Sequence, residues 1–157
     1  MTRIYFDLDG VLVGSKEREK WSEDLTPANK LLIGHEWWAS LPRSEEFADL
    51  IQVAERLVTK SNVYILSAPT PEPASGSGKI EWICKHLPGY FQRMILTVEK
   101  ERLAKPGDIL IDDKSKHLEA WEQEKGIGVL MPRPWNVRFS ERGSAVIKDL
   151  ENLFERK

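Results

Sequence analysis

The sequence RIYFDLDGVL at residues 3–12 is the strongest indication of the fold. An apolar run of strand character delivers two carboxylates, Asp7 and Asp9, into a turn at Gly10. In an open α/β sheet ligands bind outside the carboxyl ends of the strands, so these acids are predicted to lie at the mouth of a crevice. Neighbouring acids repel each other unless a cation lies between them or one keeps its proton. A strand ending in an ordinary Asp-Gly turn would carry the same residues, so the stretch needs support elsewhere.

A second acidic pair supplies that support. Asp112 and Asp113 end another apolar run, at residues 108–111. Mg2+ is bound in proteins by carboxylates together with substrate phosphate. Two strands that each end in paired acids therefore offer oxygen ligands for a hard cation such as Mg2+.

The rest of the chain alternates strands with helices. Residues 44–47 begin like a capping box, and the apolar residues that follow recur at helical spacing. Prolines and glycines at residues 69–78 predict a long loop, with a helix beginning at Lys79. Further strands are expected at residues 62–66, 94–97, 108–112 and 126–131, and further helices at 117–125 and 145–154. This order predicts a mainly parallel sheet with right-handed crossovers, covered by helices in a three-layer α/β/α, Rossmann-like arrangement.

Residues 14–42 are polar and irregular, and interrupt the alternation directly after the first strand. We expect them to form a small helical cap over the crevice, inserted in a single domain of residues 1–157, with hinges near Gly14 and Pro42. Trp37 and Trp38 lie in this segment. They could stack on a nucleobase or pack between the cap and the body, and the sequence leaves both alternatives open.

Composition narrows the class of protein. The 157 residues are 41% hydrophobic and 31% charged, as expected for one soluble domain with its own core. The net charge of -2 gives no general attraction to nucleic acid or to acidic membranes. Cys84 is the only cysteine and is expected on the buried side of a helix. Because the N-terminus has no apolar signal region and no run could span a bilayer, we expect a cytoplasmic protein.

Polar groups follow four of the predicted strands, in the order acid pair, Ser67, Lys100, acid pair. This order resembles the haloacid dehalogenase superfamily of phosphohydrolases, with its DxDG, Ser or Thr, Lys and terminal acidic motifs. Within it the chain is most similar to the 5'(3')-deoxyribonucleotidases, through ILSAPT at residues 65–70, ILTVEK at 95–100 and DILIDDK at 108–114. The resemblance covers residues 4 to about 136 and is poor at 14–42.

The resemblance implies a role for each matching residue. Asp7 would be the nucleophile that forms an aspartyl phosphate, and Asp9 the general acid and base. Ser67 would hydrogen-bond the phosphoryl oxygens and Lys100 would neutralise them, although Lys79 and Lys105 compete with Lys100 for this role. The implied Mg2+ ligands are Asp7, the backbone carbonyl of Asp9, Asp112 and Asp113. The predicted substrate contacts are Gly10, Ala68, Trp37 and Trp38.

Other polar residues are expected to play no part in the site. Lys114 and Lys116 are interpreted as solvated residues at a helix start. His35, His86 and His117 lack the spacing of metal ligands and are assigned to the surface or to helix packing.

The resulting hypothesis is a Mg2+-dependent phosphomonoesterase acting on a small phosphate ester, above all a (deoxy)nucleoside monophosphate. Alternatives are a phosphatase for nucleic-acid ends, which the net charge disfavours, one for another small ester, and a non-catalytic relative that binds phospho-ligands. A signalling receiver domain is disfavoured, because receivers carry their acidic pair after the first strand whereas Asp112 and Asp113 come late. The preferred base and sugar, and the oligomeric state, stay open.

Overall fold

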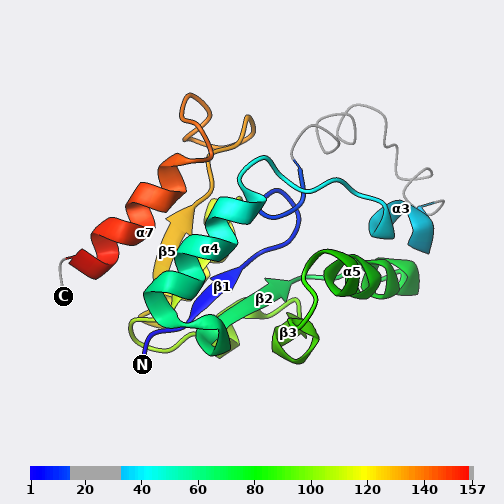
Figure 1. The fold of residues 1–157 in the computed structure, drawn as a ribbon, viewed down its shortest axis with the longest axis horizontal. Helices are drawn as coiled ribbons and strands as arrows, with labels where there is room; N and C mark the ends of the chain where they lie inside the picture. Colours follow the sequence, from blue (N-terminus) through cyan, green and yellow to red (C-terminus); the bar gives the residue numbers. More distant parts are fainter. Residues whose placement is uncertain (15–32, 156–157) are drawn as a thin grey trace.

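A computed structural model of the protein describes residues 1–14 and 33–155. Its sheet has five parallel strands in the order β3-β2-β1-β4-β5 (Figure 1). The strands are β1 (Ile4–Phe6), β2 (Val63–Ser67), β3 (Met94–Leu96), β4 (Ile109–Asp112) and β5 (Ile127–Leu130). The described helices are α3 (His35–Ala39), α4 (Phe47–Val58), α5 (Pro73–His86), α6 (Ser115–Gln123) and α7 (Ala145–Glu155), with short 3-10 turns η1 (Lys60–Asn62), η2 (Phe91–Arg93) and η3 (Lys100–Leu103).

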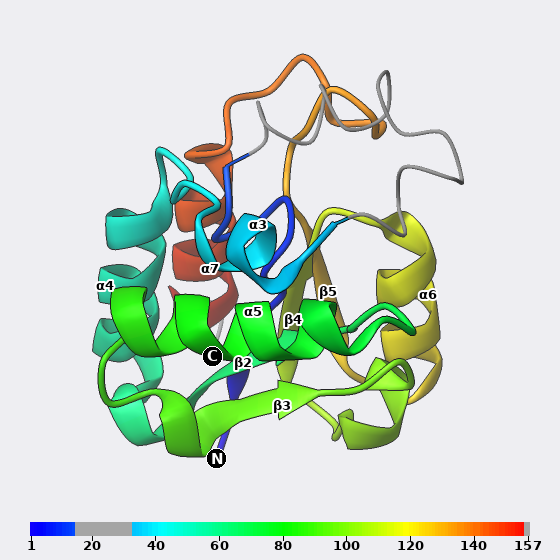
Figure 2. The same ribbon diagram turned by 90° about the vertical axis from the view of Figure 1, so that its right-hand side faces the viewer.

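Side chains along the strands alternate between the two faces of the sheet, and each face packs in its own hydrophobic core. Phe6 belongs to the core that also holds residues of α4, α5 and α7, whereas its neighbour Tyr5 packs with Trp121 of α6 on the other face. Figure 2 shows α4 and α7 on one side of the sheet and α6 on the other. The predicted three-layer α/β architecture is therefore confirmed.

Strand β1 lies at the centre of the sheet and sets the place of the first acidic pair. It pairs with β2 and β4 in parallel, and the backbone N–H of Asp7 continues the ladder by donating to the carbonyl of Ile111 at 2.9 Å. The chain then turns sharply at Gly10, whose φ of 79° is readily adopted only by glycine. Because β1, β2 and β4 run parallel, their carboxyl ends meet at one edge of the sheet.

The two ends of the predicted cap lie side by side. The N–H of Gly14 donates to the carbonyl of Pro42 at 2.9 Å, and Val13 forms an isolated antiparallel β-bridge with Arg43. The predicted hinges near Gly14 and Pro42 are therefore neighbours in space. Residues 15–32 of this expected cap lie outside the described residues, but α3, at its end, packs against α5.

Two expectations about helix starts were wrong. The helix expected from Lys79 begins at Pro73, because proline is tolerated in the first helical turn, and it runs through Gly76 and Gly78. The predicted capping box does not form: the N-cap of α4 is Glu46, and the Ser44 hydroxyl has no hydrogen-bond partner.

The expected burial of Cys84 was also wrong. Its neighbours Trp82 and Ile83 are fully buried, but Cys84 is exposed. Each helical residue is rotated by about 100° from the last, so a buried pair can be followed directly by an exposed residue. Among the described residues, no helix combines the length and the apolar character needed to cross a membrane.

Candidate active site

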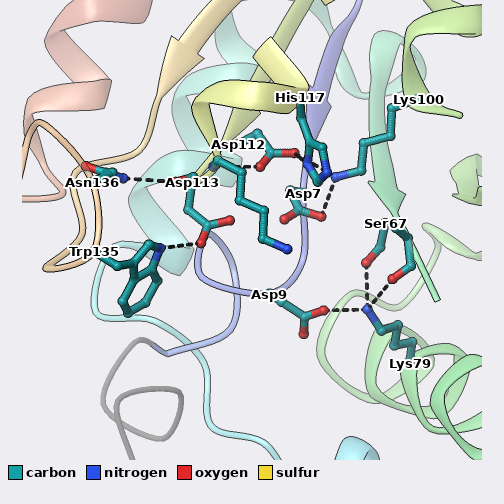
Figure 3. A network of polar contacts seen from close by, with 12 residues as sticks. Asp7, Asp9, Ser67, Lys79, Lys100, Asp112, Asp113, His117, Trp135 and Asn136 are labelled. Atoms are coloured by element: carbon teal, nitrogen blue, oxygen red, sulfur yellow. Dashed lines mark hydrogen bonds and ion pairs between the residues drawn. The ribbon is translucent and has the colours of Figure 1, made fainter. Parts of the chain in front are cut away.

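Asp7 and Asp112 share a buried lysine at the carboxyl edge of the sheet (Figure 3). The Lys100 ammonium lies 2.7 Å from Asp7 Oδ1 and 2.7 Å from Asp112 Oδ2. All three residues are at most 5% exposed. The three come from the ends of β1 and β4 and from η3, which follows β3. Parallel strands thus bring together residues about one hundred positions apart.

Asp113 joins this group and is held from the opposite side. The indole N–H of Trp135 donates to Asp113 Oδ2 at 2.7 Å. The amide of Asn136 donates to the backbone carbonyls of Asp113 and Met131, at 3.0 and 2.8 Å. The loop after β5 therefore holds Asp113 in place.

Burial and neighbouring charges shift the pKa values of Asp7 and Asp112, the two carboxylates that share Lys100, in opposite directions. Burial raises the pKa of Asp7, its acidic neighbours Asp112 and Asp9 raise it further, and Lys100 offsets only part of the effect. Burial also opposes ionisation of Asp112, but its hydrogen bond with His117 and the Lys100 charge outweigh burial and lower its pKa to about 2. Burial favours the neutral amine of Lys100, yet the two acids raise its pKa. Asp112 is thus the firmly ionised carboxylate of the pair.

The acids fit a divalent cation. One carboxylate oxygen each from Asp7, Asp112 and Asp113 can be chosen so that all lie within 4.8 Å of one another, and all three residues are buried. Mg2+ and similar hard cations take oxygen ligands in clusters of this kind. A cation there would also relieve the mutual repulsion that raises the pKa of Asp7. Among the predicted ligands, the structure thus groups these three side chains.

Asp9 and Ser67 lie at the same edge, joined by a lysine. The Lys79 ammonium is paired with the Asp9 carboxylate and donates to Ser67 Oγ at 3.0 Å (Figure 3). It also donates to the carbonyl of Ala68 at 3.0 Å. Of the three lysines considered from the sequence, Lys100 and Lys79 therefore both belong to the site, whereas Lys105 is exposed.

The sequence interpretation missed one further residue, and the expectation for it was wrong. His117, assigned to the surface or to helix packing, bonds through Nδ1 to Asp112 Oδ2 at 2.8 Å. It lies in the first turn of α6, five residues beyond the acid that it contacts. The signal was its short spacing from the acidic pair, since a helix that starts after a strand end turns its first residues back toward that end.

The two tryptophans of α3 differ in exposure. Trp38 is 5% exposed and belongs to the core that faces α4, α5 and α7. Its ring lies 5.0 Å from the Lys79 ammonium. Trp37 is partly buried and packs edge to face against Trp38. Trp38 thus packs in the core, and contact with a nucleobase remains a prediction for both tryptophans.

The chain is similar to known nucleotidases. A family model described as "5' nucleotidase, deoxy (Pyrimidine), cytosolic type C protein" matches residues 29–154. The 5'(3')-deoxyribonucleotidases of Bacillus subtilis (strain 168) and of Bacillus phage SPbeta are each 29% identical to the chain over 85 residues. The aligned stretch covers 54% of this chain and 47% of each relative, so the chain spans about half the length of the curated relatives it matches.

Proposed function

The chain belongs to the deoxy 5'-nucleotidase family of type C, and we propose that it hydrolyses the phosphate monoesters of (deoxy)nucleosides. One observation carries the proposal: Asp7, Lys100 and the acids Asp112 and Asp113 converge at the carboxyl edge of the sheet. Phosphoryl transfer needs a nucleophile on phosphorus and positive charge around its oxygens. The converging groups offer both.

Asp7 is the proposed nucleophile. Its carboxylate oxygen forms a bond to phosphorus while the bond from phosphorus to the ester oxygen breaks, which gives an aspartyl phosphate and an alcohol. Asp9 gives the departing oxygen its proton. Asp9 then takes a proton from the water that attacks phosphorus, the bond to Asp7 breaks, and inorganic phosphate is released. General acid and base help of this kind contributes typically ~10²–10⁴-fold.

Lys100 and Ser67 are proposed to hold the phosphoryl oxygens. The Lys100 ammonium is buried and close to Asp7, so it lies where negative charge would gather. Ser67 ends β2 with its hydroxyl buried beside Lys79. The turn at Gly10 and the backbone at Ala68 border the same edge, which supports their predicted contact with the substrate.

Asp7, Asp112 and Asp113 would hold the proposed Mg2+, with the backbone carbonyl of Asp9 as a further predicted ligand. When bound, the cation supplies positive charge that lets a phosphate dianion approach a group of acids. The role of the chain is to hold these oxygens in place. Trp135 and Lys114 contribute to this: Trp135 donates to Asp113, and the backbone N–H of Lys114 donates to Asp112 Oδ1 at 2.9 Å.

A phosphate-release assay tests the proposal. Nucleoside 5' and 3' monophosphates, sugar phosphates and an end-phosphorylated oligonucleotide are each offered with Mg2+ and with a chelator. We expect release from nucleoside monophosphates, loss of release with the chelator, and no release by Asp7→Asn. Release from none of the substrates would refute the proposal. Preference for the oligonucleotide would instead support a phosphatase for nucleic-acid ends.

The proposed location is the cytoplasm. Among the described residues no helix could cross a membrane, and the lone Cys84 allows no disulfide within the chain. Cell fractionation with a specific antibody tests this point, and recovery of the protein with the membrane fraction would contradict it.

A further inference from the structure

Lys79 is a buried cation to which the reaction scheme gives no role. It is 1% exposed and projects from α5 to the carboxyl edge of the sheet (Figure 3). An ammonium has three N–H donors, and three acceptors surround this one: the Asp9 carboxylate, Ser67 Oγ and the Ala68 carbonyl. Each of its donors can therefore be matched to a defined acceptor.

The fold does not need this charge to hold α5. Trp82 and Ile83 already bury the same helix in the core, and both are fully buried. Burying a charge is costly, and buried ion pairs are often replaced by apolar residues without loss of stability. A buried lysine at such a place, beside the proposed general acid, points to a role in the reaction.

The three acceptors are not equivalent. Ser67 ends β2 and the Ala68 carbonyl follows it directly, so both belong to the rigid edge of the sheet. Asp9 lies in the turn after β1, beyond the last residue of the strand, and its side chain is 20% exposed. The ammonium therefore ties the less buried carboxylate to the fixed edge of β2.

Helix α3 fixes Lys79 from its other side. The Trp38 ring lies 5.0 Å from the ammonium, within the range of a cation–π contact. The helices approach closely at Gly78, where an added Cβ would lie 2.3 Å from Trp38 Cβ and 2.7 Å from the carbonyl of His35. The packing of α3 on α5 thus sets where the ammonium lies.

We propose that Lys79 is a positioning residue that acts through Asp9: anchored on Ser67 and Ala68, it holds the Asp9 carboxyl group where the ester oxygen departs. This inference rests on the proposed function. A shift of a reacting group by about 1 Å can cost ~10²-fold in rate, so a fixed Asp9 matters most for esters whose alcohol cannot leave without a proton.

The test compares two leaving groups. Lys79→Met is expected to lower kcat/KM for a nucleoside monophosphate at least ~10-fold, whereas kcat/KM for p-nitrophenyl phosphate falls by less than about 3-fold, because nitrophenolate leaves without protonation. In an Asp9→Asn background the same substitution should lower kcat/KM for the nucleotide by less than about 2-fold further, since groups acting as a unit are not additive.

The proposal would be overturned if Lys79→Met lowered kcat/KM equally for both substrates. It would also be overturned if the effects of Lys79→Met and Asp9→Asn on kcat/KM multiplied in the double variant. Lys85→Met is the matched control, because Lys85 is an exposed lysine of the same helix, and it should leave both rates unchanged. If Lys79→Met does not fold, Lys79→Gln removes the charge and keeps a hydrogen-bonding group. Its kcat/KM values are then judged by the same two comparisons, between the leaving groups and in the double variant.

A melting experiment decides the pairing even if the protein hydrolyses no ester, in which case the proposed function fails but the inferred contact does not. Lys79→Met leaves the Asp9 charge against an apolar side chain, and Asp9→Asn removes that charge. The double variant is therefore expected to melt at least ~3 °C above Lys79→Met alone. A double variant that melts at or below the single variant would show that Lys79 does not hold Asp9.

Discussion

The Lys100 ammonium lies 2.7 Å from Asp7 Oδ1, although 93 positions separate the two residues in the chain. Both side chains are buried, and Lys100 contacts Asp112 at the same distance. A shared cation lets two acids be buried side by side, which would otherwise be costly. The strand ends therefore form a buried, highly polar site.

Lys100→Met is expected to lower the rate of phosphate release by at least ~10²-fold, since it removes a positive donor from the phosphoryl oxygens. It also leaves two buried acids without their cation, which costs about 3–5 kcal/mol of unfolding free energy. Steady-state kinetics and urea denaturation measure the two effects. Lys105→Met, which replaces an exposed lysine nearby, should change neither. An active, fully stable Lys100→Met variant would contradict the site.

His117→Phe is expected to weaken Mg2+ binding about 10-fold or more, because residues that orient a ligand typically contribute 10–100-fold to metal affinity. His117 contacts Asp112 Oδ2, the oxygen that also accepts a hydrogen bond from the Lys100 ammonium. Isothermal titration with Mg2+ measures the change. Glu119→Gln, on an exposed residue of the same helix, is the control. Unchanged affinity in His117→Phe would assign the histidine to packing alone.

Gly78→Ala is expected to destabilise the protein by ~1–3 kcal/mol, since the new methyl group would overlap Trp38 and overpacking has this cost. Gly76→Ala, two residues earlier in the same helix, meets nothing within 4 Å and should stabilise it by ~0.5–1 kcal/mol. Urea denaturation of both variants gives the comparison. Equal effects of the two substitutions would contradict the close contact between α3 and α5.

We expect His86 to contribute to the pH dependence of the free energy of unfolding. Burial lowers the pKa of His86 below its ordinary value of 6.5, and the charges of Arg43 and Lys85 lower it further. Below pH 6.5 the unfolded chain therefore binds more protons than the folded one, so the free energy of unfolding falls as the pH falls through this window. His86→Gln should weaken this dependence between about pH 7.5 and 5.5. An NMR titration midpoint at or above 6.5 would contradict it.

Much of the site could be predicted because apolar runs that end in polar residues mark the carboxyl ends of strands. Asp7, Ser67 and Asp112 were each recognised in this way, and parallel pairing of β1 with β2 and β4 brings these ends to one edge. The distances between the residues were not predictable. They depend on packing between segments that are far apart in the chain.

Two separate physical causes explain what was misjudged. Lys79 follows prolines and glycines that suggest a loop, but Pro73 begins a helix and Gly78 allows α3 to approach it. The expected surface or packing role of His117 and the expected burial of Cys84 both failed, because a helical residue's surroundings depend on the rotation of its helix against the sheet. The sequence gives the helix but not that rotation.

The most direct measurement of the central claim is a search for a phosphoryl group on Asp7. The Asp9→Asn variant, in which water attack is slowed, is mixed with Mg2+ and p-nitrophenyl phosphate, whose leaving group needs no proton, and is then quenched in acid, digested and analysed by mass spectrometry. We expect a phosphorylated peptide that contains Asp7 and disappears in Asp7→Asn. Phosphate release by the native enzyme with no such adduct, or with an adduct on another residue, would contradict it.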